Sequence, residues 1–224
     1  LPMGLNAGAQ LHWQFLTDPG LRDRTAWIMT LPQYWGFRLT GVPATDVTSL
    51  GCHTDLWNPT ARCFSVLVDR LGIRDRIAPP RLPADRLGAI LPEVAALTGL
   101  SAETPVTCGI HDSNASLLPH LLARRPPFSV VSTGTWVITL SVGGRPVTLD
   151  PARDTLFNVN AFGDPVASAR FMGGREHDQV MAGRTARATP ADCATVLSRG
   201  VMLLPAVEPR SGPFQDRAAR WTDA

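Results

Sequence analysis

The fold of this chain is decided by the segment from Pro105 to Leu122, which reads PVTCGIHDSNASLLPHLL. Its first part, Pro105–Ile110, is short and apolar, as expected of a buried β-strand. A helix-compatible run follows from Ala115 to Leu122. Asp112 therefore falls at a strand-to-helix junction, where the helix dipole and free N–H groups favour a charged carboxylate. Such a group can accept a hydroxyl proton, although an ordinary N-cap aspartate is the commoner explanation of this local pattern.

A second polar segment, Val130–Trp136, lies about twenty positions further along the chain. Here a strand leads into a hydroxyl-rich turn centred on Gly134 and then into another strand. Glycine allows a ligand to approach the backbone closely, and the hydroxyls of Thr133 and Thr135 can surround phosphate oxygens together with turn N–H groups. Taken alone, an ordinary hairpin turn is the better explanation. A Walker A loop is excluded, because it needs a lysine and this chain has none.

The remaining patterns predict a mixed α/β protein. Apolar periodicity and capping residues predict helices at Leu5–Leu16, Asn58–Leu71 and Thr189–Arg199, the last two ended by Gly72 and Gly200. Further strands are predicted at Phe128–Val131, Trp136–Val142, Leu156–Phe162, Val166–Phe171 and Val201–Leu204. The arginine- and proline-rich stretch 123–127 predicts a connector. We therefore expect one domain at residues 1–123 and a second at residues 124–224.

The composition of the 224 residues, with 44% hydrophobic and 18% charged, is that of a chain able to form a packed core. The net charge is +2 and the basic residues are scattered, which argues against a nucleic-acid partner. No apolar run approaches the ~20 residues needed to span a bilayer, and no signal peptide is evident. The four cysteines lack C-x-x-C spacing, which argues against structural zinc. We expect them to be buried thiols of a cytoplasmic protein.

The polar segments, taken together, resemble motifs of the FGGY family of carbohydrate kinases. Gly109–Ser113 is similar to the G-x-H-D-[ST] segment that carries the catalytic aspartate of that family. Ser132–Trp136 is similar to the S-[ST]-G-T-W turn of its rhamnulokinase- and fuculokinase-like branch. Upstream, Tyr34–Gly41 resembles the family's Y-x-x-x-x-L-T-G helix end, and Thr45–Ser49 its T-D-x-T-x-A-S segment. These motifs also occur in the family's order.

The resemblance implies an actin-like, ribonuclease-H-like α/β fold in which two domains close over a cleft. Residues 1–123 would then be the end of an N-terminal sugar-binding domain, and residues 124–224 the beginning of a C-terminal nucleotide-binding domain. The implied activity is phosphoryl transfer from MgATP to a hydroxyl of a sugar, often a ketose or a polyol. The implied partners are therefore a small-molecule sugar and ATP, with no nucleic acid or membrane, and a homo-oligomer is left open.

The same resemblance implies a role for individual residues. Asp112 corresponds to the general base, and His111 and Ser113 to residues that touch the sugar. Thr135 corresponds to a threonine that contacts ATP, with Thr133 and Gly134 in the same turn. Gln179 falls where a further nucleotide contact would come, although the neighbouring segment 171–177 departs from the branch's pattern.

Two features of the family have no counterpart in these residues. One is the D-x-G-T hairpin that positions phosphates and Mg²⁺, so the main metal ligand is expected outside this sequence. The other is a glycine-rich segment that holds adenosine. We therefore expect an internal fragment, incomplete at both ends, that is poorly folded and inactive by itself.

Two other interpretations were compared with the kinase. A non-catalytic remnant or regulatory sugar-binding module would keep the sugar edge at His111–Ser113 without transferring phosphate, and an in-frame D-x-G-T segment upstream would distinguish it from a kinase. A hydrolase that uses Ser113, His111 and Asp112 is disfavoured, because neighbouring residues point in different directions and no G-x-S-x-G elbow is present. The sequence does not identify the sugar.

Overall fold

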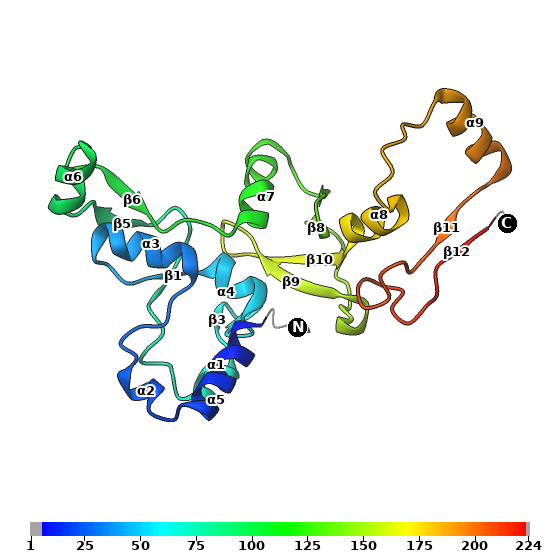
Figure 1. Ribbon diagram of the computed structural model, residues 1–224. Coiled ribbons are helices and arrows are strands. Elements are labelled where there is room, and N and C mark those ends of the chain that lie inside the picture. Colours follow the sequence, from blue (N-terminus) through cyan, green and yellow to red (C-terminus); the bar gives the residue numbers. More distant parts are fainter. Residues whose placement is uncertain (1–5, 223–224) are drawn as a thin grey trace. The chain divides into compact units, whose positions relative to one another are not determined.

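A computed structural model describes residues 6–222, which fall into two compact units. Unit 1 contains the described residues up to Arg124 together with Phe157–Val166. Unit 2 contains Arg125–Leu156 and the described residues from Ala167 onward. Each unit mixes helices and strands (Figure 1), so the α/β class predicted from the sequence is confirmed.

Unit 1 is built mainly from short helices. They are α1 Ala7–Thr17, α2 Leu21–Arg24, α3 Leu31–Thr40, α4 Val47–His53, α5 Val66–Leu71, α6 Pro92–Thr98 and α7 Asp112–Ala123. Helix α1 matches the predicted first helix, except that Leu5 lies outside the described residues. Its N-cap Asn6 accepts a hydrogen bond from the N–H of Ala9 at 2.9 Å, which satisfies one of the free amides of the first turn.

The helix predicted from Asn58 is wrong at its start. Residues 57–64 instead form a hairpin of β2 Trp57–Asn58 and β3 Cys63–Phe64, and α5 begins only at Val66. Asn58 caps the tight turn: its Oδ1 accepts from the N–H groups of Thr60 and Ala61. An Asn-Pro pair favours such a turn as readily as a helix start. The predicted end of α5 is confirmed, because Gly72 is left-handed with φ of 63°.

The strands of unit 1 pair only over short stretches. β1 Thr45–Asp46 is parallel to β4 Pro80–Arg81, and β5 Arg86–Ala89 is antiparallel to β6 Pro105–Thr107. A cluster of buried apolar side chains joins α1, α4 and α5 to the loops after them: Phe15, Leu50, Leu56, Val68, Leu71, Ile73 and Ile77. This core holds α4, whose two ends both reach the candidate site.

Unit 2 contains most of a four-stranded antiparallel sheet, ordered β7-β8-β10-β9. Its strands are β7 Phe128–Ser132, β8 Val137–Val142, β9 Thr155–Val159 and β10 Pro165–Phe171, close to the predicted ranges. The tip of the β9–β10 hairpin belongs to unit 1. The short helix η1 Pro151–Arg153 precedes β9, while α8 Gly173–Met181 and α9 Pro190–Arg199 follow β10. The short strands β11 Leu203–Leu204 and β12 Arg220–Trp221 pair antiparallel.

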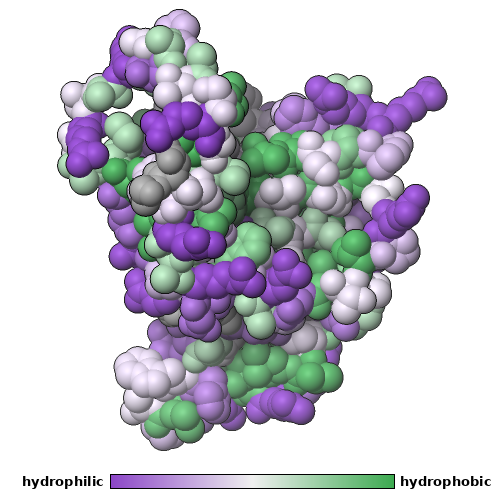
Figure 2. Space-filling model, turned by 90° about the vertical axis from the view of Figure 1, so that its right-hand side faces the viewer, coloured by the Kyte–Doolittle hydropathy of each residue, from purple (hydrophilic) through white to green (hydrophobic). Residues whose placement is uncertain are grey.

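Helix α9 has the boundaries that its sequence predicts. Thr189 and Asp192 form a reciprocal capping box, and Gly200 ends the helix with a left-handed φ of 63°. Apolar side chains nevertheless remain at the surface of unit 2, including Leu197 and Trp221. Figure 2 shows apolar groups interspersed with hydrophilic ones on one face of the molecule.

Candidate active site

Asp112 is the first residue of α7 and carries an exposed carboxylate. Its side chain is 91% exposed, and its Oδ1 accepts a hydrogen bond from the N–H of Ser113 at 2.6 Å. His111, with extended backbone, occupies the N-cap position without a side-chain capping bond. The N-cap explanation of Asp112 is therefore wrong. The carboxylate lies beside free amides at the helix N-terminus, where negative charge is electrostatically favourable.

The two neighbours of Asp112 lie within reach of its carboxylate. Nδ1 of His111 is 3.3 Å from Oδ1 of Asp112, although the pair lacks hydrogen-bond geometry, and the His111 side chain is 20% exposed. Oγ of Ser113 lies 3.3 Å from the same oxygen. The structure thus brings together the three residues that the sequence analysis selected in this segment, and leaves the carboxylate as the most accessible of their groups.

The strand-to-helix junction before Asp112 is held by backbone and side-chain hydrogen bonds from other elements. Nε2 of Gln33, a fully buried residue of α3, donates to the carbonyl of Cys108 at 3.0 Å. The N–H of Cys108 donates to the carbonyl of Asp85, and that of Gly109 to the carbonyl of Pro83. Gly109 has a φ of 88°, which residues with a side chain rarely adopt. The junction is therefore fixed before any ligand binds.

Helix α4 ties a second element to the junction through a buried aspartate. Asp46 is the N-cap residue of α4 and is fully buried. It accepts hydrogen bonds from the N–H groups of Thr48 and Ser49 and from both of their hydroxyls. Oγ1 of Thr48 also accepts from the N–H of His111 at 2.9 Å. In the sequence, this segment stands out only through its resemblance to a family motif. An aspartate followed by hydroxyl residues two and three positions later is a recognisable capping signal.

The thiol of Cys108 lies buried inside this junction and stays protonated near neutral pH. Burial raises the pKa of Cys108 to about 12, because a thiolate there would lose its hydration. Cys52 is also buried, as expected, but Cys63 and Cys193 are exposed. The expectation that all four cysteines are buried is therefore wrong for two of them, which lie on an exposed hairpin and an exposed helix.

In unit 2, the turn between β7 and β8 presents the second set of predicted residues. Thr133, Gly134 and Thr135 are exposed, and no side-chain hydrogen bond of the two threonines occurs within the part of the chain that the structure describes. Gly134 does not have a positive φ, and a Cβ placed on it would meet only the Trp136 carbonyl oxygen at 3.8 Å. Gly134 is therefore not required for a left-handed backbone, and the space beside it is open, as the close approach of a ligand would need.

The conformation of the β7–β8 turn depends on a glycine outside it, Gly174, which lies at the start of α8. A Cβ on Gly174 would lie 2.3 Å from the carbonyl oxygen of Gly134 and 2.9 Å from Cα of Thr135. A Cβ on Gly173 would lie 2.5 Å from Cγ2 of Val137. The glycine pair thus lets the N-terminus of α8 touch the backbone of the turn. Free helix amides beside two exposed hydroxyls form a recurrent phosphate-binding arrangement.

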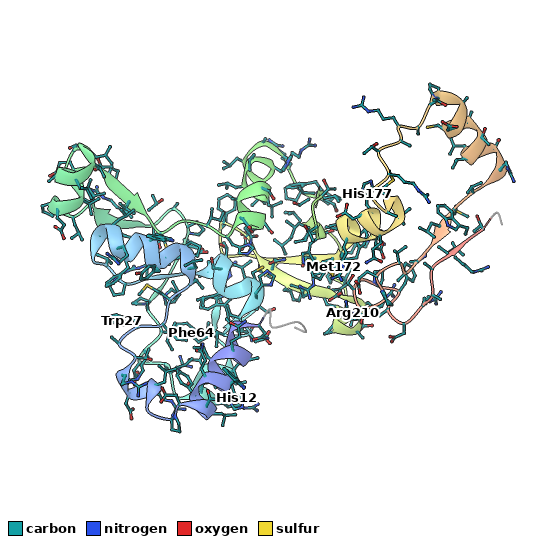
Figure 3. All side chains as sticks on the ribbon, viewed as in Figure 1. His12, Trp27, Phe64, Met172, His177 and Arg210 are labelled. Carbon is teal, nitrogen blue, oxygen red and sulfur yellow. The ribbon has the colours of Figure 1, made fainter. Side chains whose placement is uncertain are left out.

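Helix α8 is anchored by its acidic and basic residues. Oε1 of Glu176 accepts from the N–H groups of Val207 and Glu208, and Arg175 pairs with the buried carboxylate of Glu208 at 3.3 Å. Hydrogen bonding from Arg210 lowers the pKa of Glu208, which keeps that carboxylate charged. Figure 3 places Met172 where β10 meets this helix. The helix is therefore held in register with the turn.

The same helix carries Gln179 and borders a cavity. Gln179 is exposed on the second turn, about 9 Å along the axis from Gly173. A cavity of about 270 Å³ lies along α8, and Figure 3 shows His177, one of its lining residues, projecting from that helix. Gln179 therefore lies away from the threonine turn, and its nucleotide role stays a prediction.

The base of the turn is fixed by a buried ion pair that sequence reasoning missed. Arg170 donates to Oδ1 of Asp154 at 3.1 Å, with the two side chains 7% and 9% exposed. Its guanidinium also lies 4.8 Å from the centre of the Trp136 ring. Oδ2 of Asp154 accepts from the N–H of Gly212 at 2.8 Å. A stacked, paired arginine of this kind holds Trp136 immediately before β8.

Comparisons with known proteins place the whole chain in one family. Residues 2–119 match the N-terminal domain of the FGGY family of carbohydrate kinases, and residues 125–224 match the carbohydrate kinase FGGY C-terminal domain. The chain belongs to this family, as its motifs predicted, and has the actin-like, ribonuclease-H-like fold of such kinases. No described helix is long and apolar enough to cross a membrane.

Among solved structures, a carbohydrate kinase from Novosphingobium aromaticivorans is 41% identical with a TM-score of 0.89, covering 100% of this chain and 52% of that one. A ligand-bound xylulose kinase from Lactobacillus acidophilus is 19% identical with a TM-score of 0.77, covering 98% and 46%. Xylulose kinase of Bacillus subtilis (strain 168) is 33% identical over 106 residues, which are 46% of this chain and 21% of that protein. The chain spans about half the length of these solved structures. The rhamnulokinase-like branch stays a prediction.

Proposed function

We propose that the protein containing this chain transfers the γ-phosphoryl group of ATP to a hydroxyl of a sugar, with Asp112 as general base. The observation that carries the proposal is the exposed Asp112 carboxylate, which stands on a junction fixed by Gln33 and Thr48. Phosphoryl transfer depends mainly on positioning and electrostatic stabilisation, which such a fixed, charged group supplies.

In this mechanism, Asp112 accepts the proton of the sugar hydroxyl as that oxygen forms its bond to the γ-phosphorus. The bond from the phosphorus to the β–γ bridging oxygen breaks, and ADP leaves. His111 and Ser113, which flank the base, hold the sugar by hydrogen bonds. We assign the sugar to residues 1–123, as the end of the N-terminal domain, and the nucleotide to residues 124–224, as the beginning of the C-terminal domain.

The turn of unit 2 fits the phosphates of ATP. Thr133 and Thr135 offer exposed hydroxyls, Gly134 offers an open backbone, and the N-terminus of α8 packs against the same turn. Mg²⁺, when bound, neutralises charge on the phosphate oxygens during transfer. The segment 132–136 contains no carboxylate, so we assign the ion to none of these residues. The acceptor sugar is proposed to be a ketose or a related polyol, in line with the xylulose kinases among the relatives.

The test replaces the carboxylate with its amide in the full-length protein that contains this chain. Asp112→Asn keeps the shape of the side chain but cannot accept the proton, so we expect turnover to fall by about 10²–10⁴-fold. ADP release is measured with a panel of ketoses, aldoses and polyols, and sugar affinity by calorimetry.

The matched control is Asp75→Asn, an exposed aspartate elsewhere in unit 1, which should leave turnover unchanged. Sugar affinity should survive in both variants. Turnover of Asp112→Asn within about ten-fold of the unsubstituted protein would remove Asp112 from the role of base.

A further inference from the structure

Three metal-binding side chains meet immediately beside the Asp112 junction. One donor atom each from Cys52, His53 and His111 lies within 4.8 Å of the other two. Cys52 and His53 are the last two residues of α4, and His111 precedes α7. The rings of the two histidines contact each other edge-on, with centres 5.5 Å apart. Residues 53 and 111 are far apart in the sequence, so no local sequence motif predicts that these three side chains meet.

One thiol and two imidazoles form a ligand set that suits cations with affinity for sulfur and nitrogen, such as Zn²⁺. Zinc binds thiolate sulfur at ~2.3 Å and imidazole nitrogen at ~2.0–2.1 Å, commonly through three protein ligands with a fourth position open. Tetrahedral bonds of those lengths separate donor atoms by about 3.4–3.6 Å. The observed separations, none above 4.8 Å, require only small side-chain rotations to reach those values. We propose that Cys52, His53 and His111 bind one divalent cation of the Zn²⁺ class.

The frame that carries these ligands is already rigid. Asp46 caps α4 through four hydrogen bonds, and Thr48 of the same helix accepts from the N–H of His111. Helix α4 and the residue before α7 therefore keep their spacing without the metal. Pre-organised ligands reduce the ordering cost of binding.

Asp112 lies where a metal-binding histidine usually has a second, outer hydrogen-bond partner. Its Oδ1 lies 3.3 Å from Nδ1 of His111, a nitrogen with no solvent exposure. Metal-ligating histidines commonly donate their second ring N–H to a carboxylate, which orients the ring. If a small rotation lets Nδ1 donate to Asp112, Nε2 is left unprotonated and is the nitrogen that we assign to the cation. The cation would therefore bind next to the carboxylate that we propose as the base.

Occupancy of this site has a consequence for the sugar. His111 cannot bind a metal and contact a sugar through the same nitrogen, so Zn²⁺ and the sugar should compete. This consequence rests on the proposed function, whereas the metal site itself does not. The cation would then inhibit the kinase by occupying the sugar edge.

The site is tested on the full-length protein, without nucleotide, by Zn²⁺ calorimetry and by Co²⁺ absorption spectroscopy. Co²⁺ bound through a thiolate gives a sulfur-to-metal charge-transfer band. We expect that band in the unsubstituted protein and its loss in Cys52→Ala, with Zn²⁺ affinity at least about ten-fold weaker in both Cys52→Ala and His53→Gln. Circular dichroism and thermal melting establish that each variant is folded. If Cys52→Ala does not fold, Cys52→Ser takes its place.

Matched controls are Cys63→Ser and His177→Ala, an exposed thiol and an exposed imidazole outside the cluster, which should bind Zn²⁺ as before. Equal affinity in folded Cys52→Ala and unsubstituted protein, or equal weakening in the controls, overturns the site.

A second arm adds an accepted sugar during the Zn²⁺ titration. Weaker apparent Zn²⁺ affinity supports the overlap of metal and sugar at His111. Zn²⁺ binding that depends on Cys52 but is unaffected by sugar keeps the metal site and removes His111 from the sugar contacts. Failure of the metal site and failure of the proposed sugar role are thus separate results.

Discussion

The junction at residues 108–113 in unit 1 and the turn at residues 132–136 in unit 2 are held by different means. Buried hydrogen bonds from Gln33 and Thr48 fix the junction. The turn instead depends on close backbone packing against Gly174 and on Arg170 stacked over Trp136. The junction thus presents a single charged group from a rigid support. Among the described residues, the turn instead leaves the hydroxyls of Thr133 and Thr135 without hydrogen bonds, as a phosphate-binding loop needs.

Among changes to the supports of these two segments, the largest effect is expected at the contact between α8 and the turn. Gly174→Val places a branched side chain where even a Cβ would lie 2.3 Å from the Gly134 carbonyl oxygen. Either the helix or the turn must move, so we expect a loss of stability of about 1–3 kcal/mol, as is usual for overpacking. ATP affinity, measured by calorimetry on the full-length protein, should fall at least about ten-fold, the equivalent of ~1.4 kcal/mol.

Gly134→Val sharpens this prediction, because a Cβ at that position meets no atom closer than 3.8 Å. It should lower ATP affinity by blocking phosphate approach, yet leave sugar affinity and thermal stability nearly unchanged. Gly144→Val, with no atom within 4 Å of its Cβ, is the neutral control for both. If Gly134→Val weakened sugar rather than ATP, the turn would have been assigned to the wrong ligand.

An intermediate effect is expected from breaking the support of the junction. Thr48→Val keeps the shape of the side chain but removes the acceptor of the His111 N–H and one donor to Asp46. We expect the free energy of unfolding to fall by about 1–2 kcal/mol, and turnover to fall more than ATP affinity. Chemical denaturation and steady-state kinetics measure the two. Thr60→Val, on an exposed hairpin turn, should change neither, and an equally silent Thr48→Val contradicts the rigid-support account.

The smallest effect concerns Cys108 and is confined to high pH. Because burial raises its pKa to about 12, the folded protein keeps the thiol protonated while the unfolded chain loses the proton near pH 9. Between those values the unfolded state binds fewer protons, so this thiol lowers stability as pH rises from about 9 to about 12. Cys108→Ala should flatten that decline in denaturation curves. Near neutral pH, alkylating reagents should modify the exposed Cys63 and Cys193 before Cys108, and early modification of Cys108 would contradict its burial.

Local sequence signals succeeded where one segment contains the whole cause. The capping box of Thr189 and Asp192, with Gly200 behind it, predicts the limits of α9, because every partner lies within a few residues. Asn58-Pro59 failed for the opposite reason. The same pair suits a helix start and a tight turn, and the pairing of Trp57 with Phe64 decides between them.

By itself, the sequence determined the family and the identity of the candidate residues. The two polar motifs and their order are linear properties, and the residue types within them define the chemistry available. Tertiary structure alone decided how those residues are supported and what else they meet. Gln33 reaches Cys108 across 75 positions and Thr48 reaches His111 across 63. The meeting of Cys52 and His53 with His111 likewise exists only after α4 packs beside the junction. Contacts of this kind leave no periodicity or spacing in the chain, because folding rather than sequence proximity brings their partners together.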